Sequence, residues 1–250
     1  MKLRSLAGRA KEKMIERRLP TVIELKDFDD RGVRFVAKNL VEYYRVTEHG
    51  FETTYTREML AALRPDDVLW DIGANVGMVS LHAARTCETY AFEPDPEFSE
   101  HLAASAALND GLEINLQRIA ISDSDGPVTL FSDGASGNSP SLVRQRAEKN
   151  AITVSARSLD SLAVEGNLPL PSVVKLDIEG AEILALRGGA ELLSDGARGP
   201  RALLIEVHDE FLPGFDSSAE EVLALLDDYG FQQKAYEANR FSERHLMLER

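Results

Sequence analysis

Short apolar runs alternate along this chain with segments whose apolar residues are spaced like one face of a helix. Runs of about four to eight apolar residues favour buried strands, and a spacing of about three or four favours amphipathic helices. We predict strands at Val33–Val36, Val68–Ile72, Thr89–Glu93, Glu113–Ile121, Val173–Ile178, Leu203–Val207, Phe231–Tyr236 and His245–Glu249. We predict helices at Phe51–Leu63, Met78–Arg85, Pro96–Leu108, Ala181–Leu186 and Ala219–Tyr229. This alternation indicates an α/β fold with a mostly parallel sheet and helices on both faces.

Two segments depart from the parallel pattern. Only a short polar stretch separates the last two predicted strands, so we expect an antiparallel hairpin at the C-terminus. Residues 123–158 contain strand-like runs at Val128–Phe131 and Ile152–Ala156 around a polar stretch. We expect this insertion to be a lid or substrate-recognition loop, and the alternative is a flexible surface insertion. We assign residues 51–250 to one domain and residues 1–50 to an N-terminal appendage with a basic helix and a short strand.

The N-terminus differs in charge from the rest of the chain. The first 20 residues hold seven Lys or Arg and two Glu, a net charge of +5, and since the whole chain carries −14, the other 230 residues carry −19. Such an acidic body argues against nucleic acid as a partner. The basic segment has an apolar stripe at Leu3, Leu6, Ala7, Ala10 and Met14. It is either a weak membrane-surface or partner-docking helix or, as we favour, a packed helix with a solvated basic face.

Composition indicates a globular protein of a reducing compartment. The chain is 44% hydrophobic, has a single cysteine and has no run near the roughly 20 apolar residues of a membrane span. We therefore expect a cytoplasmic protein without disulfides. The sequence leaves the oligomeric state open.

A glycine loop follows the predicted strand at Val68–Ile72. Gly73 and Gly77 flank Asn75, and Asp71 stands at the strand end. A dinucleotide fingerprint reads G-x-G-x-x-G and lets backbone amides approach a pyrophosphate. Here the third glycine is missing and the carboxylate would repel phosphate, but it suits the ammonium and sulfonium of S-adenosylmethionine (SAM). We predict a SAM site, and expect Asp71→Ala or Gly73→Val to weaken SAM binding before it affects folding.

The next predicted strand ends in a second acid. Glu93 lies 22 positions after Asp71, close to the roughly 20-residue interval at which an acidic residue meets the ribose hydroxyls in doubly wound folds. Alone, Glu93 would be read as a solvated carboxylate. Together with the glycine loop it is predicted to bind the ribose.

Further acids and a histidine follow later strands. Asp177 and Glu179 come at the end of one strand, and Glu206 and His208 at the end of another. Because the carboxyl ends of parallel strands share one edge of a sheet, we expect these side chains to meet there. So many acids repel one another unless a cation or proton is present. SAM fits this need, and so does a divalent metal held by Asp177, Glu179 and His208.

Several motifs together resemble the FkbM family of SAM-dependent methyltransferases. They span residues 65–210 in the family's order and read D-I-G-A-N-V-G (71–77), F-E-P (92–94), S-L-D-S-L (158–162), K-L-D-I-E-G-A-E (175–182), L-R-G-G-A (186–190) and I-E-V-H (205–208). The resemblance implies a class I methyltransferase fold, which is Rossmann-like with a seven-stranded sheet. It also implies O-methylation of a hydroxyl on a small molecule or glycan, such as a sugar, glycolipid or polyketide-like product.

The resemblance also implies residue roles. Asp71, Gly73, Asn75 and Gly77 correspond to the SAM loop, and Glu93 to the ribose acid. Ala120 and Ser122 fall where such enzymes contact the adenine, and Asp177 is a further cofactor contact. The acceptor cannot be carried over from the family, because the motifs lie outside residues 1–50 and the 132–150 loop.

An aliphatic hydroxyl is a poor nucleophile, so its proton must be removed. His208 is the first candidate for the base, since an unperturbed imidazole titrates near neutrality. Asp177 and Glu179 would orient His208, bind the hydroxyl or hold a metal. The alternatives are N- or carboxyl-methylation on the same fold, a non-catalytic SAM-binding regulator and, with little weight, an NAD-type oxidoreductase.

Overall fold

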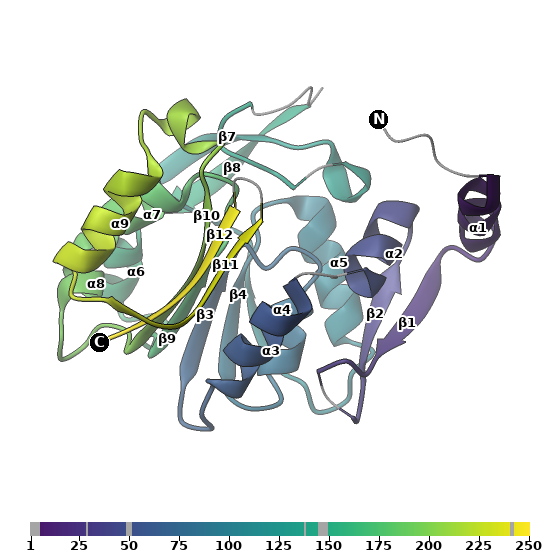
Figure 1. Cartoon of the computed structure of the whole chain (residues 1–250), viewed down its shortest axis with the longest axis horizontal. Coiled ribbons are helices and arrows are strands. Elements are labelled where there is room, and N and C mark those ends of the chain that lie inside the picture. Colours follow the sequence, from purple (N-terminus) through teal and green to yellow (C-terminus); the bar gives the residue numbers. More distant parts are fainter. Residues whose placement is uncertain (1–5, 29, 49–51, 138, 145–149, 241–242) are drawn as a thin grey trace.

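A seven-stranded sheet with helices on both faces forms the centre of the molecule (Figure 1). The structure, a computed structural model, describes residues 6–28, 30–48, 52–137, 139–144, 150–240 and 243–250. In spatial order the strands are β11 (Gln232–Arg240), β12 (Glu243–Glu249), β10 (Ala202–His208), β9 (Val173–Leu176), β3 (Val68–Ile72), β4 (Glu88–Phe92) and β5 (Ile114–Gln117). Pairing is parallel from β10 to β5, whereas β12 is antiparallel to both of its neighbours. The predicted α/β class and C-terminal hairpin are confirmed.

Two groups of helices cover the sheet (Figure 1). One face carries α3 (Glu52–Ala61), α4 (Met78–Ala83) and α5 (Pro96–Ala106). The other carries α6 (Leu159–Glu165), α7 (Glu182–Arg187), α8 (Ala190–Ser194) and α9 (Ala219–Asp228). None of the helices among the described residues is long and apolar enough to cross a membrane.

Strand alternation decides which core each side chain joins. In β3, Trp70 and Ile72 belong to the cluster under α7–α9, while Leu69 packs with Met59 of α3 on the opposite face. Asp71 therefore points to the α3–α4 face, because successive side chains of a strand alternate. The register places Asp71 directly opposite Lys175 of β9. The sheet thus carries a buried ion pair on its α3–α4 face.

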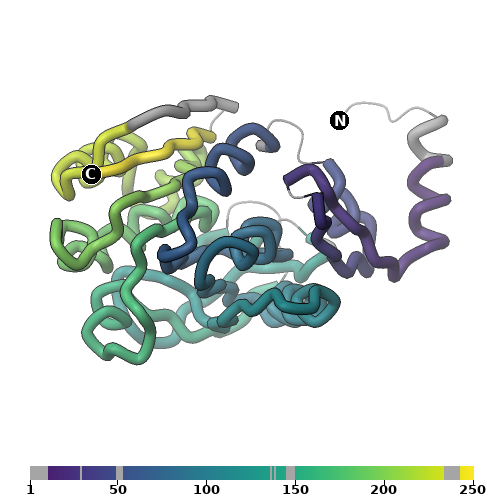
Figure 2. The backbone as a smooth tube through the Cα atoms, turned by 90° about the horizontal axis from the view of Figure 1, so that it is seen from below, coloured from purple at the N-terminus to yellow at the C-terminus, as the bar shows by residue number. Residues whose placement is uncertain are grey.

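The N-terminal region is attached to the sheet through α5. It comprises α1 (Leu6–Glu16), β1 (Thr21–Leu25), β2 (Val33–Ala37) and α2 (Leu40–Thr47), and it lies at the opposite end of the molecule from the C-terminal strands (Figures 1 and 2). The β2 backbone is held by two side chains near the end of α5: Arg34 N donates to Asn109 Oδ1 at 2.8 Å and Val36 N to Ser105 Oγ at 3.0 Å. The predicted strand at 33–36 is confirmed, whereas β1 and α2 were not predicted.

The single strand predicted at Glu113–Ile121 was wrong. The chain leaves the main sheet after β5 and joins a separate three-stranded sheet, ordered β6 (Ala120–Ile121), β8 (Ala151–Arg157) and β7 (Gly126–Phe131). The break has a local cause, because Gln117 closes the pairing with β4 by accepting a hydrogen bond from Glu93 N at 3.0 Å. Two 3₁₀ helices, η1 (Gly134–Ser136) and η2 (Leu212–Phe215), complete the fold. The insertion predicted at 123–158 therefore contributes two paired strands, β7 and β8, to this second sheet.

Candidate active site

A cavity of about 350 Å³ lies at the carboxyl ends of the central strands. Its wall includes seven of the residues predicted for the site: Gly73, Asn75, Glu93, Ala120, Asp177, Glu179 and His208. Three predicted cofactor residues, Asp71, Gly77 and Ser122, do not line the cavity. The edge of the sheet therefore forms one cavity, as expected, but Asp71, Gly77 and Ser122 are not part of its wall.

The glycine loop has a backbone that side chains would disrupt. Gly73 has φ +83°, and a Cβ there would lie 1.8 Å from the backbone oxygen of Asp177. At Gly77, with φ +86°, a Cβ would lie 2.1 Å from Leu102. Asn75 adopts φ 52° between them. The expectation that Gly73→Val affects binding before folding is therefore reversed, because the close approach of Gly73 to the 177–180 loop is part of the fold.

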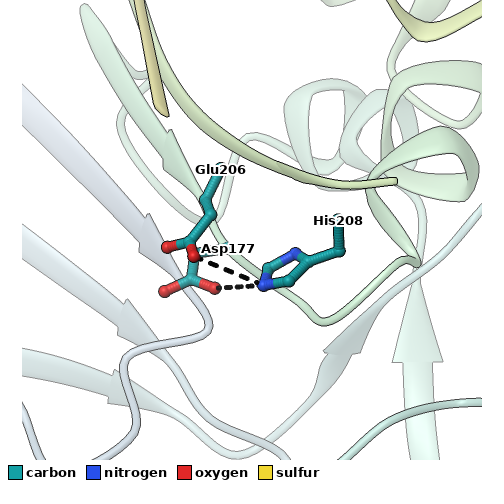
Figure 3. A group of neighbouring side chains, drawn as sticks. All are labelled: Asp177, Glu206 and His208. Carbon is teal, nitrogen blue, oxygen red and sulfur yellow. Dashed lines mark ion pairs between the residues drawn. The ribbon is translucent and has the colours of Figure 1, made fainter. Parts of the chain in front are cut away.

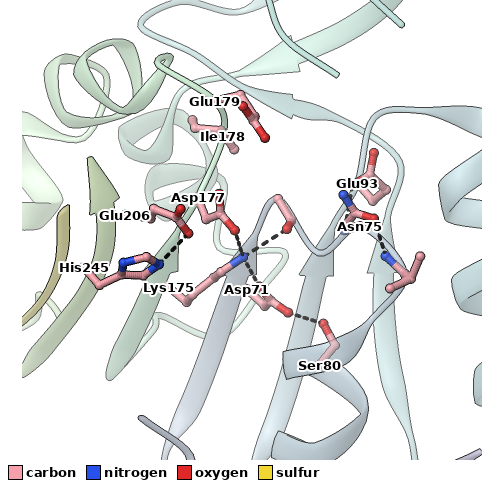
Figure 4. A network of polar contacts seen from close by, with 12 residues as sticks. Asp71, Asn75, Ser80, Glu93, Lys175, Asp177, Ile178, Glu179, Glu206 and His245 are labelled. Atoms are coloured by element: carbon pink, nitrogen blue, oxygen red, sulfur yellow. Dashed lines mark hydrogen bonds and ion pairs between the residues drawn. The ribbon is translucent and has the colours of Figure 1, made fainter. Parts of the chain in front are cut away.

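Glu93 holds this loop through a hydrogen bond from the backbone of Asn75 (Figure 4). One carboxylate oxygen accepts from Asn75 N at 2.8 Å and the other from Asp95 N at 2.9 Å. Asp95 in turn caps α5 by accepting from Glu97 N. Burial raises the pKa of Glu93 to about 7, although these two backbone hydrogen bonds oppose the rise. Each oxygen keeps lone-pair capacity for a ligand hydroxyl.

Asp71 lies behind the cavity. It is fully buried, accepts from Ser80 Oγ at 2.5 Å and lies 3.3 Å from Lys175 Nζ (Figure 4). The same ammonium lies 3.1 Å from Asp177 Oδ2 and donates to the backbone oxygen of Gly73 at 3.0 Å. The carboxylate expected to face the ammonium of SAM instead faces a lysine. Asp71 positions the loop and does not reach the cavity.

A histidine and three acids converge at the ends of β9 and β10. His208 Nε2 lies 3.5 Å from Glu206 Oε1 and 3.9 Å from Asp177 Oδ1 (Figure 3). It also lies 4.0 Å from Glu179 Oε2. His208 is 3% exposed, while the Asp177 side chain is 32% exposed toward the cavity. The cluster predicted from the strand ends is therefore present.

Glu182, at the start of α7, was missed as a site residue. Its Oε1 accepts from the backbone N–H groups of Ile178 and Gly180 at 3.2 and 3.1 Å, and it lies 2.9 Å from His208 Nδ1. The side chain is fully buried. One carboxylate therefore fixes both the loop that carries Glu179 and the ring of His208. The signal was present as the last letter of the K-L-D-I-E-G-A-E motif.

The charges of this cluster change the proton assignment. Burial alone would lower the pKa of His208, but the carboxylates of Glu182, Glu206 and Asp177 outweigh it and raise this pKa well above its ordinary value. Without a bound cation, these carboxylates therefore favour the protonated imidazole. Burial raises the pKa of Glu179 to about 7, with Asp177 adding to the rise and His208 opposing it. Glu179 is therefore the acid of this cluster best matched to proton transfer near neutrality.

The candidate metal ligands also differ from the expected set. Asp177, Glu206 and His208 offer ligand atoms that all lie within 4.8 Å of one another. The prediction had Glu179 in place of Glu206. Alternation along β10 places Glu206 on the α3 face, and the antiparallel neighbour β12 supplies His245, whose Nε2 lies 3.2 Å from Glu206 Oε2. His245 was not predicted because the sequence does not show that β12 lies beside β10.

The insertion contributes a wall of the cavity. Residues 139–142 line it, and Ser141 Oγ donates to the backbone oxygen of Glu179 at 3.1 Å. Arg45 of α2 lines the same cavity and donates from Nη2 to the backbone oxygen of Gly137 at 3.2 Å. Residues 138 and 145–149 of the predicted loop lie outside the described residues. Elements from the appendage and the insertion thus share the rim of the site.

The fold and the position of this cavity define a class I methyltransferase. A methyltransferase FkbM from Methylobacillus flagellatus aligns with a TM-score of 0.53 at 18% identity, over 83% of this chain and 50% of that longer chain. Magnesium protoporphyrin IX methyltransferase from Synechocystis, solved with bound SAM, aligns with a TM-score of 0.50 at 14% identity, over 86% of this chain and 85% of that one. The family profile described as Methyltransferase FkbM domain matches residues 71–232, and the chain belongs to this family.

Three curated relatives are named as methyltransferases. Hexuronic acid methyltransferase AglP of Haloferax volcanii is 27% identical over 76% of this chain and 75% of its own length. The 2-O-methyltransferase NoeI of Sinorhizobium fredii is 27% identical over 69% and 76%. The 31-O-demethyl-FK506 methyltransferase FkbM of Streptomyces tacrolimicus is 28% identical over 68% and 74%. The prediction of an enzyme of the FkbM methyltransferase family is confirmed.

Proposed function

We propose that this enzyme transfers the methyl group of SAM to a hydroxyl oxygen of a sugar, glycolipid or polyketide-like acceptor. The observation that carries the proposal is one cavity that joins the glycine loop and Glu93 to the Asp177–Glu179–His208 cluster. Names of relatives support it, because two of them specify methylation at oxygen and a third specifies a hexuronic acid.

The residues present suit SAM. The close approach at Gly73 leaves no room for a side chain, and Glu93 can accept ribose hydroxyls beside the loop. Ala120 lies in the wall where the adenine is expected. When bound, SAM supplies an electrophilic methyl carbon, which forms a bond to the acceptor oxygen as its bond to sulfur breaks and leaves the electron pair on S-adenosylhomocysteine (SAH).

The acid cluster would prepare the acceptor. Glu179 is assigned to take the hydroxyl proton, since its carboxyl reaches the cavity and has a pKa of about 7. Asp177 and His208 would orient the hydroxyl toward the methyl group. Positioning of this kind supplies up to about 7–11 kcal/mol of the barrier in favourable cases, and a positioned base adds about 10²–10⁴-fold.

The first test is calorimetry with SAM and SAH, with NAD as the control. We expect micromolar binding of SAM or SAH and none of NAD. Failure of folded protein to bind either compound would contradict the cofactor assignment.

The second test follows tritium from the SAM methyl group into a panel of hexoses, hexuronic acids and polyketide alcohols. An ether product resists mild alkali, whereas a methyl ester is hydrolysed, so alkali-labile label would show carboxyl methylation and overturn the hydroxyl assignment. N-methylation is read from the product by NMR. Glu179→Gln and Asp177→Asn are expected to lower turnover about a hundredfold or more while SAH still binds. Glu220→Gln, an exposed acid of α9, is the matched control.

A further inference from the structure

Three side chains at the carboxyl ends of β9 and β10 direct one atom each toward a common point (Figure 3). We propose that Asp177, Glu206 and His208 form a site for one divalent cation of the Mn²⁺ or Mg²⁺ class. The catalytic use of this ion rests on the proposed methyl transfer, whereas its binding does not.

The spacing of the free atoms suits a cation. An ion about 2.1 Å from each ligand places neighbouring ligands about 3.0 Å apart and opposite ligands about 4.2 Å apart. His208 Nε2 lies 3.5 Å from Glu206 Oε1 and 3.9 Å from Asp177 Oδ1, within that interval. Both separations are longer than a hydrogen bond. The three atoms are therefore placed around a point between them and are not bonded to one another.

Each ligand is held at its other atom by a buried partner. A carboxylate on the second nitrogen of a histidine is typical of metal-binding histidines, because it fixes the ring and its tautomer. Each acid of this triad likewise has its second carboxylate oxygen beside a buried cationic or imidazole side chain, so all three free atoms are fixed in direction. The partners are Glu182 on His208 Nδ1 at 2.9 Å, His245 on Glu206 Oε2 at 3.2 Å and Lys175 on Asp177 Oδ2 at 3.1 Å.

His208 provides a second reason to place a cation here. The residue is 3% exposed, and within the described part of the chain no hydrogen bond reaches its Nε2. A cation that replaces the ring proton would bind this nitrogen and offset the repulsion between Asp177 and Glu206. Glu179, 4.0 Å from Nε2, would stay outside the triad and available for the acceptor proton.

The ligand types limit the metal. Two carboxylates favour hard cations such as Mg²⁺ and Mn²⁺, and one imidazole favours Mn²⁺ of the two. The Asp177 side chain is 32% exposed toward the cavity, so a coordination position would face the acceptor. There the ion would polarise the acceptor hydroxyl.

The experiment is titration of the full chain with Mn²⁺ alone, followed by the electron paramagnetic resonance signal of the free ion. We expect one Mn²⁺ per chain in the wild type, displaced by Mg²⁺. Asp177→Asn, Glu206→Gln and His208→Ala are each expected to abolish this binding. Glu182→Gln, which removes charge behind His208, is expected to weaken it about tenfold to hundredfold. SAH calorimetry on each variant checks folding and tests the cofactor site separately.

Two acids of the same cavity are the controls. Glu179→Gln and Glu243→Gln each remove one negative charge from the cavity wall without removing a proposed ligand, and both are expected to keep the wild-type affinity for Mn²⁺. An equal loss in all the acid variants would indicate a diffuse negative field and overturn the site. Absence of Mn²⁺ binding in a wild-type protein that binds SAH would also overturn it, while leaving the methyltransferase proposal intact.

Discussion

Replacement of Glu93 by glutamine isolates the contribution of one carboxylate to cofactor binding. In the structure its two oxygens accept separate backbone N–H groups, from Asn75 and Asp95. Glutamine has one oxygen, so one of these N–H groups would face an amide NH₂. A buried donor left in this way costs about 1–3 kcal/mol of unfolding free energy. The glycine loop should therefore loosen, but the protein should still fold.

The loss in SAH affinity can be worked from the same contacts. Hydrogen bonds to a charged group contribute about 1.5–3 kcal/mol each, against about 1 kcal/mol for neutral partners. For two ribose hydroxyls the difference is about 1–4 kcal/mol, or roughly fivefold to several hundredfold in Kd. Glu88→Gln, at the other end of the same strand, is the matched control, because Glu88 is exposed and its side chain accepts a hydrogen bond from the neighbouring Tyr90 hydroxyl.

The pH dependence supplies a second, sharper readout. Burial raises the pKa of Glu93 to about 7 in the free protein, and ribose hydroxyls bind the ionised form. Binding therefore competes with protonation, and SAH affinity should fall about tenfold between pH 8 and pH 6. The sign for folding is opposite: the folded state binds this proton at higher pH than the unfolded state, so this group favours folding as the pH falls from about 7 to 4.5.

Isothermal titration calorimetry of SAH at pH 8, 7 and 6 measures both effects. We expect SAH affinity to change with pH in the same way in the wild type and in Glu179→Gln. Glu179 is a second cavity carboxyl with a pKa of about 7, but it is not the acid assigned to the ribose. The Glu93→Gln variant should bind SAH weakly, and its affinity should not change with pH. The assignment of Glu93 to the ribose would be refuted if SAH affinity of the wild type did not change with pH. It would also be refuted if Glu93→Gln kept the pH dependence of the wild type.

Two stability predictions follow from the buried parts of the site. Gly73→Ala should lower the unfolding free energy, measured by urea denaturation, by about 1–3 kcal/mol more than Gly111→Ala, which shares the positive φ (+83° and +76°) but has open space around it. Equal losses would show that the contact with Asp177 relaxes freely. Lys175→Met should cost about 3–5 kcal/mol, since it leaves Asp71 and Asp177 without their cation. The exposed Lys26→Met should change stability by less than about 0.5 kcal/mol, and a similar loss in both variants would argue against the buried pair.

The side chains at the strand ends could be predicted from one rule of sheet geometry. A parallel sheet brings Glu93, Asp177, Glu179 and His208 to one edge wherever the strands lie in order, and each acid directly follows an apolar run. The same patterns placed the α/β class and the C-terminal hairpin. Predictions from sequence succeeded here because they needed only strand positions and direction.

The roles of Asp71 and His208 depended on contacts that the sequence does not display. Asp71 turned away from the cavity because the register sets it opposite Lys175, and no local pattern specifies that register. The pKa of His208 is raised by the carboxylates of Glu182, Glu206 and Asp177, which lie in α7, in β10 and after β9. The strand predicted at 113–121 failed for a related reason, since hydrophobicity continues through residues that belong to two separate sheets.

Lys175 connects the two halves of the site. Its ammonium touches the backbone of the glycine loop at Gly73, the buried Asp71 and the cavity acid Asp177. Those contacts and the close packing of Gly73 against Asp177 make the cofactor loop and the acid cluster one mechanical unit. Burial would raise the pKa of Asp177, but Lys175, together with His208 and His245, outweighs burial and lowers it. Lys175 therefore couples the position of the cofactor loop to the ionisation of the carboxylate of Asp177 beside the cavity.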